Sequence, residues 1–242
     1  PLGQKIVSVN WIAGLGTSNI FVVVDPPIVL NGTIEEWNES NNRANKSITV
    51  GGWNFVYGDI NPLSEFELAT PSNKSVIRWN AADSKSGNLY VTDSESLIFW
   101  TRLQAIGKNI SGGNTTNDFT DIDTLLNMTN FVDSVKNIYT NSSGTIKNLT
   151  SFTIFNKVIN GVPIADSTNN TNFVTGILWD TSDDSNGQYD ISDKEDLVFV
   201  TKINKKSQGA YGIYDYEIKI PVKLREYYTA DTNNVFIYFD LN

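Results

Sequence analysis

The chain has 242 residues, with 18 Lys and Arg against 27 Asp and Glu, a formal net charge of −9, and neither Cys nor His. It therefore has no thiolate nucleophile, no Cys/His zinc site and no Ser-His-Asp triad, and its negative charge disfavours nucleic acid. No apolar run reaches the roughly 18 residues of a membrane span, whereas 40% hydrophobic and 12% aromatic residues are enough for a substantial core.

Most of the chain reads as short β-strands between turn residues. β-branched and aromatic residues concentrate in segments 5–11, 19–24, 96–103, 197–203, 214–220 and 235–241, each bounded by Gly, Asn, Asp, Ser or Pro. Residues 97–100 (LIFW) are apolar on both faces and predict a central strand. In the segment near residue 215, Tyr214, Tyr216, Ile218 and Ile220 alternate with Ile213, Asp215, Glu217 and Lys219. This period of two predicts one face in the core and one in water.

One helix is predicted over 121–139, with Thr120 or Asp121 as its N-cap. Its common apolar face would contain Ile122, Leu125, Leu126, Val132 and Val135. The pattern as a whole predicts an all-β protein, an antiparallel and jelly-roll-like β-sandwich, with this short helix inserted. We expect an N-terminal strand and hinge over 1–24 and a single sandwich over 25–242.

An internal repeat is the most specific feature of the pattern. Residues 79–101 align without gaps to 179–201, and eight of the 23 positions are identical. Each copy reads as a strand ending at Trp79 or Trp179, an acidic loop containing glycine, and an apolar strand. The repeat predicts two related edges of one sandwich, or alternatively two small domains.

The second acidic loop offers hard oxygen ligands of the kind that Ca²⁺ prefers. They belong to Asp180, Asp183, Asp184, Asn186, Asp190 and Asp193, around Gly187. The alternative is a turn in which Asp and Asn bond their own backbone while glycine supplies a positive φ. Acidic pairs such as Glu195 and Asp196 have no spacing that marks a glycosidase acid and nucleophile. We therefore expect no enzyme, and Ca²⁺ as the one candidate cofactor.

Asparagine is abundant, and ten of its 30 positions open Asn-x-Ser/Thr sequons, where chance would give about five. These are Asn31, Asn38, Asn45, Asn73, Asn109, Asn114, Asn127, Asn141, Asn148 and Asn169. A used sequon needs an exposed Asn on an exported chain. The pattern predicts an extracellular, cell-surface glycoprotein carrying N-linked glycans, although an Asn-, Ser- and Thr-rich composition also makes sequons by accident.

The N-terminal segment resembles a detachable strand. Residues 5–11 are largely apolar, with Val7, Val9 and Trp11 on one face and Ile6 on the other. Gly14 and Gly16 follow as a hinge. Such a strand could complete the sheet of a neighbouring copy and cover an edge that would otherwise aggregate. The alternative is that residues 5–11 pair within their own sheet.

Several short stretches resemble carbohydrate-binding module family 9 and the glucodextranase C-terminal module. They are 25–37 (DPPIVLNGTIEEW, with Asn31 where the family has Asp), 53–59 (WNFVYGD), 88–91 (NLYV) and 216–222 (YEIKIPV). These stretches stand in the family's order, but leave roughly 105–175 unmatched. The resemblance implies an antiparallel sandwich with a sugar ligand stacked on exposed Trp or Tyr. Trp37 and Trp53 lie nearest the matched motifs, and we expect both in the core.

Two function classes follow from these features. The first is a structural subunit of an N-glycosylated surface filament or surface layer, a homopolymer of copies joined by the N-terminal strand. A Cys-free, sequon-dense, β-rich chain of this kind resembles archaeal donor-strand filaments in its organisation. The second class is a secreted carbohydrate-binding module, for which we expect an exposed aromatic platform and a self-contained monomer.

Overall fold

The computed structural model describes residues 8, 16–23, 43–61, 65–70, 73–78, 86–93, 97–108, 111, 113–115, 117–168, 171–193, 195–224 and 235–241. The chain divides into two compact units, residues 1–51 and 52–242. The first unit contains an antiparallel ribbon in which β1 (Gly16–Val23) pairs with β2 (Arg43–Val50). The predicted strand over 19–24 is thus confirmed as far as Val23.

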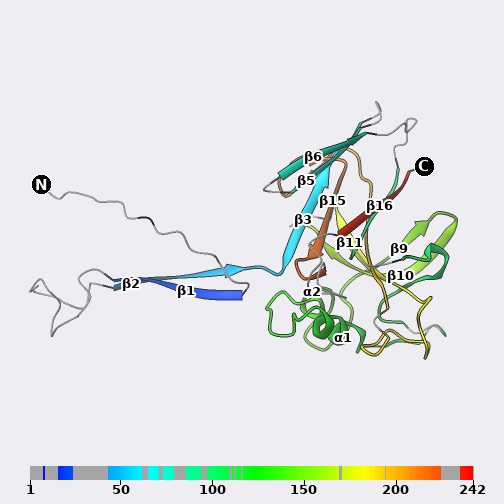
Figure 1. Ribbon diagram of the computed structural model, residues 1–242, viewed down its shortest axis with the longest axis horizontal. Coiled ribbons are helices and arrows are strands. Elements are labelled where there is room, and N and C mark those ends of the chain that lie inside the picture. Colours follow the sequence, from blue (N-terminus) through cyan, green and yellow to red (C-terminus); the bar gives the residue numbers. More distant parts are fainter. Residues whose placement is uncertain are drawn as a thin grey trace, which may run out of the picture. The chain divides into compact units, whose positions relative to one another are not determined.

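The second unit contains two larger antiparallel sheets, so the predicted all-β sandwich is confirmed (Figure 1). In the five-stranded sheet, β15 (Tyr216–Pro221) pairs with β3 (Trp53–Gly58), and β3 pairs with β5 (Glu65–Thr70). β4 (Ile60–Asn61) and β6 (Asn73–Arg78) also pair with β5.

The seven-stranded sheet follows the order β16-β7-β12-β11-β10-β9. These strands are β16 (Val235–Leu241), β7 (Gly87–Asp93), β12 (Leu197–Lys202), β11 (Val174–Asp180), β10 (Lys157–Asp166) and β9 (Leu149–Ile154). A short strand, β8 (Leu103–Ala105), pairs with the last residues of β11. β13 (Ser207–Gly209) and β14 (Gly212–Tyr214) form a separate hairpin.

Both faces of the seven-stranded sheet are covered by apolar side chains. Leu89, Trp179 and Phe199 belong to the core shared with β3 and β15. Tyr90, Leu178 and Val198 point to the opposite face, where β9 and β10 supply further core residues such as Phe152 and Val162. Because both faces are buried, β11 and β12 read in sequence as continuous apolar runs.

The helical region contains two short helices instead of the single one predicted, namely α1 (Asp118–Leu125) and α2 (Val135–Tyr139). They lie at the end of this unit away from β5 and β6 (Figure 1). α1 follows Asn117, not Thr120 or Asp121, and Val132 is 84% exposed instead of buried. The buried Asp123 carboxylate accepts bonds from the backbone of Val135 (2.7 Å) and Lys136 (3.2 Å) at the start of α2. No helix among the described residues is long and apolar enough to cross a membrane.

The prediction of a central strand at 97–100 is wrong. Residues 97–99 belong to no strand, and a 3₁₀ turn follows at Trp100–Arg102. Leu97 and Phe99 are exposed. The carboxylate of Asp180 accepts a bond from the backbone N–H of Phe99 (2.5 Å), so the end of β11 fixes this segment without a strand ladder.

The two copies of the sequence repeat consequently differ in structure. Gly187 lies in the loop between β11 and β12, as expected, whereas the aligned Gly87 is the first residue of β7. Leu197 begins a central strand, whereas the aligned Leu97 does not.

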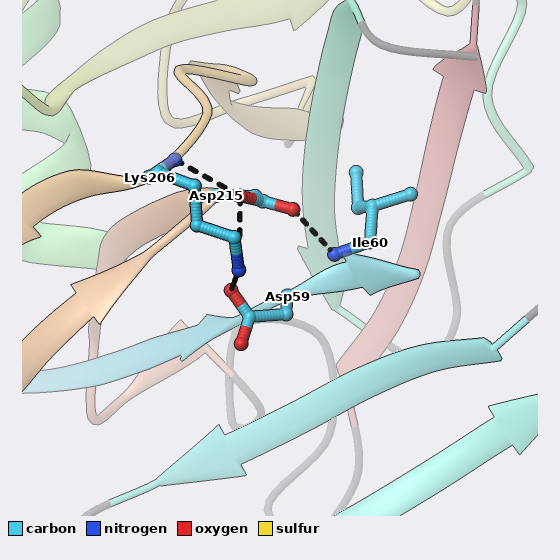
Figure 2. Close-up of polar contacts among 4 residues, drawn as sticks. All are labelled: Asp59, Ile60, Lys206 and Asp215. Atoms are coloured by element: carbon cyan, nitrogen blue, oxygen red, sulfur yellow. Dashed lines mark hydrogen bonds and ion pairs between the residues drawn. The ribbon is translucent and has the colours of Figure 1, made fainter. Parts of the chain in front are cut away.

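Asp215 and Glu217, predicted to face water, are buried, whereas Ile213 of the same predicted face is exposed. Asp215 accepts bonds from the backbone N–H of Ile60 (2.8 Å) and Lys206 (3.0 Å). The Lys206 ammonium lies 3.0 Å from Asp59 and 3.9 Å from Asp215 (Figure 2). The Asp215 carboxylate thus links β4 to the loop before β13, and these bonds compensate its burial.

Candidate assembly, glycosylation and cation sites

The predicted donor residues Ile6, Val7, Val9 and Trp11, and the hinge residue Gly14, lie outside the described residues. Gly16 is the first residue of β1. Along this ribbon Phe21, Val22 and Val23 are all exposed, and the Arg43 guanidinium lies 4.3 Å from the centre of the Phe21 ring. A two-stranded ribbon is marginally stable by itself, and these three consecutive apolar residues of β1 are exposed.

The predicted glycosylation sites are exposed wherever the side chain is described. This holds for Asn45 in β2 and for Asn114, Asn127, Asn141 and Asn148 in the second unit. Asn73 is the first residue of β6, but its side chain is not among those described. The remaining sequon residues, Asn31, Asn38, Asn109 and Asn169, lie outside the described residues.

Asn141 has the most defined geometry of these sequons. Its Oδ1 accepts bonds from the backbone N–H of Ser143 (3.0 Å), the Ser143 hydroxyl (2.7 Å) and the backbone N–H of Thr145 (2.9 Å). Its Nδ2, the atom that a glycan modifies, makes no hydrogen bond within the described residues. The turn thus fixes the amide oxygen and leaves the nitrogen available at an exposed position.

The acidic loop between β11 and β12 is held by bonds of its own side chains, as the turn alternative predicts. Asp184 accepts bonds from the backbone N–H of Asn186 (3.0 Å) and Gly187 (2.7 Å). The hydroxyl of Ser192 bonds Asp190 and lowers the pKa of that carboxyl. Gly187 has a φ of +93°. These bonds join the acidic side chains of the loop to groups of the same loop.

The same loop also gathers three carboxylates. One oxygen each from Asp184, Asp193 and Glu195 lie within 4.8 Å of one another. Glu195 is fully buried, and this burial raises its pKa from 4.5 to about 7. Three hard oxygen donors suit Ca²⁺ or Mg²⁺ in chemistry, although Ca²⁺ takes six to eight ligands.

The six predicted ligands are therefore only partly brought together. Asp184 and Asp193 share the cluster, whereas Asp183 and Asn186 are exposed elsewhere on the loop. Asp180 is buried at the end of β11, where it bonds the backbone of Phe99 and Ser182. Glu195 was not predicted as a ligand, although its position two residues after Asp193 could have marked it as a further carboxylate ligand.

The end of the seven-stranded sheet contains a polar network and a cavity that the sequence did not predict. The Asp240 carboxylate accepts bonds from the backbone of Asn88 (2.6 Å) and Phe155 (3.2 Å) and from the Tyr90 hydroxyl (2.8 Å). Beside it lies a cavity of about 240 Å³, and the residues that line it are Tyr90, Trp100, Phe155, Ile237, Tyr238 and Phe239.

A second aromatic group lies over the polar face of β15. Tyr57 stacks on Tyr211 (5.2 Å between ring centres) and on Tyr214 (4.7 Å), and Tyr211 is 49% exposed. Beneath them, Glu217 accepts bonds from the Tyr214 hydroxyl and from the backbone of Ala210 (2.9 Å). Burial raises the pKa of Glu217.

Two stretches that carry the family resemblance are neighbours in the sheet, since Trp53–Gly58 pairs with Tyr216–Pro221 along its length. Trp53 is half-buried against the core, and its ring centre lies 6.2 Å from that of Phe199. Trp37 lies outside the described residues. No protein-family model matches the chain, and no curated protein or solved structure matches it either, so the resemblance stays a prediction.

Proposed function

We propose that the chain is a structural subunit of an extracellular, N-glycosylated cell-surface filament or surface layer. The observation that carries this proposal is the exposure of all five sequon asparagines whose side chains are described. Asn45, Asn114, Asn127, Asn141 and Asn148 are all exposed, so a glycan on each is compatible with the fold.

Assembly in this proposal depends on residues 5–11. Their apolar face would enter the sheet of a neighbouring copy, and the backbone of the strand would supply the hydrogen bonds. The exposed apolar residues of β1 give the same unit a second surface that favours association.

The test is to image the full chain and its variants by negative-stain electron microscopy. The double variant V7D/V9D places two charges on the apolar face and should abolish polymers. The matched control S8D/N10D places the same charges on the other face and should retain them. A wild-type chain that stays monomeric at high concentration would refute the proposal, and so would polymers of V7D/V9D.

A cation in the acidic loop is the second part of the proposal. Asp184, Asp193 and Glu195 would provide the carboxylates, and Ca²⁺ would neutralise their mutual repulsion. The cation would then stabilise the connection between β11 and β12, two central strands of the sheet.

The alternative is a carbohydrate-binding module, and the observation that favours it is the Tyr57–Tyr211 stack. Tyr211 offers an exposed ring of the kind on which sugars stack. Glycan-array binding that Y211A removes would support this function. The control I213A changes an exposed residue of the same hairpin and should leave such binding unchanged.

A further inference from the structure

The strand β16 lies at one end of the seven-stranded sheet, and its only strand partner in the described part of the chain is β7. Half of the backbone N–H and C=O groups of an edge strand point away from its partner, which makes such an edge a template for another strand. The opposite end of the sheet is β9.

A cavity lies beside β16, an edge strand of the described sheet. Ile237 and Phe239 pack on the core between the two sheets, whereas Tyr238 packs on the opposite face of its own sheet. Tyr90 of β7 also lines the cavity, so it lies against both β7 and β16, on the face of the sheet where Tyr90 and Tyr238 pack with Trp100. Trp100 forms its aromatic wall, with its ring centre 4.9 Å from Tyr90 and 5.1 Å from Tyr238.

The surroundings of the edge favour an apolar occupant. Phe236 is 44% exposed, and its ring lies 6.2 Å from that of Tyr238. The nearby Asp240 carboxylate is already bonded by Asn88, Tyr90 and Phe155, so an apolar group at the edge would not leave it unpaired. At about 240 Å³ the cavity is smaller than most small-molecule pockets and suits one or two side chains.

The segment 5–11 has the length and charge for this edge. It has seven residues, as β16 has, and its apolar side chains alternate. Residues 1–24 contain one Lys and no acidic residue in a chain of net charge −9, so the segment and the body of another copy attract each other. The segment belongs to the first unit and β16 to the second.

We propose that the open edge of β16 is the acceptor site, and that it binds residues 5–11 of a second copy as an added strand. Val7, Val9 and Trp11 would face the aromatic wall of the cavity. The inference rests on the proposed function, because it names the surface through which the subunits join.

The test uses the absence of cysteine from the chain. Full-length variants with a cysteine at Val7, Val9 or Trp11 are mixed one at a time with F236C and oxidised mildly. The matched control is L149C, at a residue 54% exposed on β9, the other edge of the same sheet. Urea denaturation of each variant verifies that it is folded.

A disulfide between two differently tagged copies, formed with F236C and not with L149C, is the expected result. Polymers that cross-link to L149C, or that form without any cross-link to F236C, would overturn the acceptor assignment and leave the proposed function standing. A monomeric disulfide in a V7C/F236C double variant, unaffected by dilution, would overturn the choice of a second copy. A wild-type chain that stays monomeric would overturn the inference and the proposed function together.

Discussion

Alanine substitutions at Gly87 and Gly187 should have very different effects, although the two glycines occupy equivalent positions in the sequence repeat. Both have positive φ, +133° at Gly87 and +93° at Gly187. A Cβ at Gly187 would meet no atom within 4 Å, whereas one at Gly87 would lie 1.9 Å from the backbone oxygen of Asp240.

The expected losses of stability follow from these contacts. A side chain at positive φ costs roughly 1–2 kcal/mol, and the lower entropy of the unfolded alanine variant returns about 0.4–1 kcal/mol. We therefore expect G187A to lose about 1 kcal/mol or less. In G87A the strand β16 must also move away from β7, and overpacking of this kind adds roughly 1–3 kcal/mol. The total for G87A is about 3 kcal/mol.

Urea denaturation followed by tryptophan fluorescence measures both variants against the wild-type chain, without interference from thiols. If G87A and G187A lose the same stability within about 0.5 kcal/mol, the close packing of β16 against Gly87 would be refuted. Equal small losses would instead favour two equivalent loops, as the repeat alone predicts.

Three further predictions concern the candidate sites. Ca²⁺ should raise the Tm of the chelator-treated chain, since a ligand at a hundredfold excess over its Kd adds ~2.7 kcal/mol; in thermal melts D184N and D193N should remove this shift and the surface control D183N should retain it. Mass spectrometry of the chain from an N-glycosylating host should find a glycan on Asn141, and an unmodified peptide would contradict this. Stability should fall as pH rises above the ordinary pKa of Glu, because burial raises the pKa of Glu217 and the unfolded chain releases this proton first. Urea titrations over a pH series should show a smaller fall for E217Q, and an unchanged slope would exclude Glu217 as a source.

Sequence patterns predicted the strands that are apolar on both faces or end at clear turns, such as β12 and β16. They were wrong at residues 97–100, which have the same apolar character as the start of β12. The two segments differ in their hydrogen-bond partners. The Asp180 carboxylate accepts a bond from the backbone N–H of Phe99, and β8 pairs with the end of β11. An apolar run alone therefore establishes neither burial nor a strand partner, since Leu97 and Phe99 are exposed.

The alternation along β15 predicted its core face and misplaced its polar face. Glu217 is buried because Tyr214 and the hairpin of β13 and β14 cover it, and no local pattern reports such a second layer. For the same reason the Asp240 network was not predictable, since Asp240 stands 150 residues from Tyr90 and 85 residues from Phe155 in the chain. The exposed sequons, by contrast, are local features that the sequence located directly.

The ladder between β16 and β7 has a mechanical consequence. Seven consecutive residue pairs join the two antiparallel strands, from Val235↔Asp93 to Leu241↔Gly87. Tension along β16 would load all of these pairs in shear at the same time, whereas a force across the strand would break them one after another. A subunit pulled through this strand would therefore resist extension with its whole ladder instead of peeling from one end.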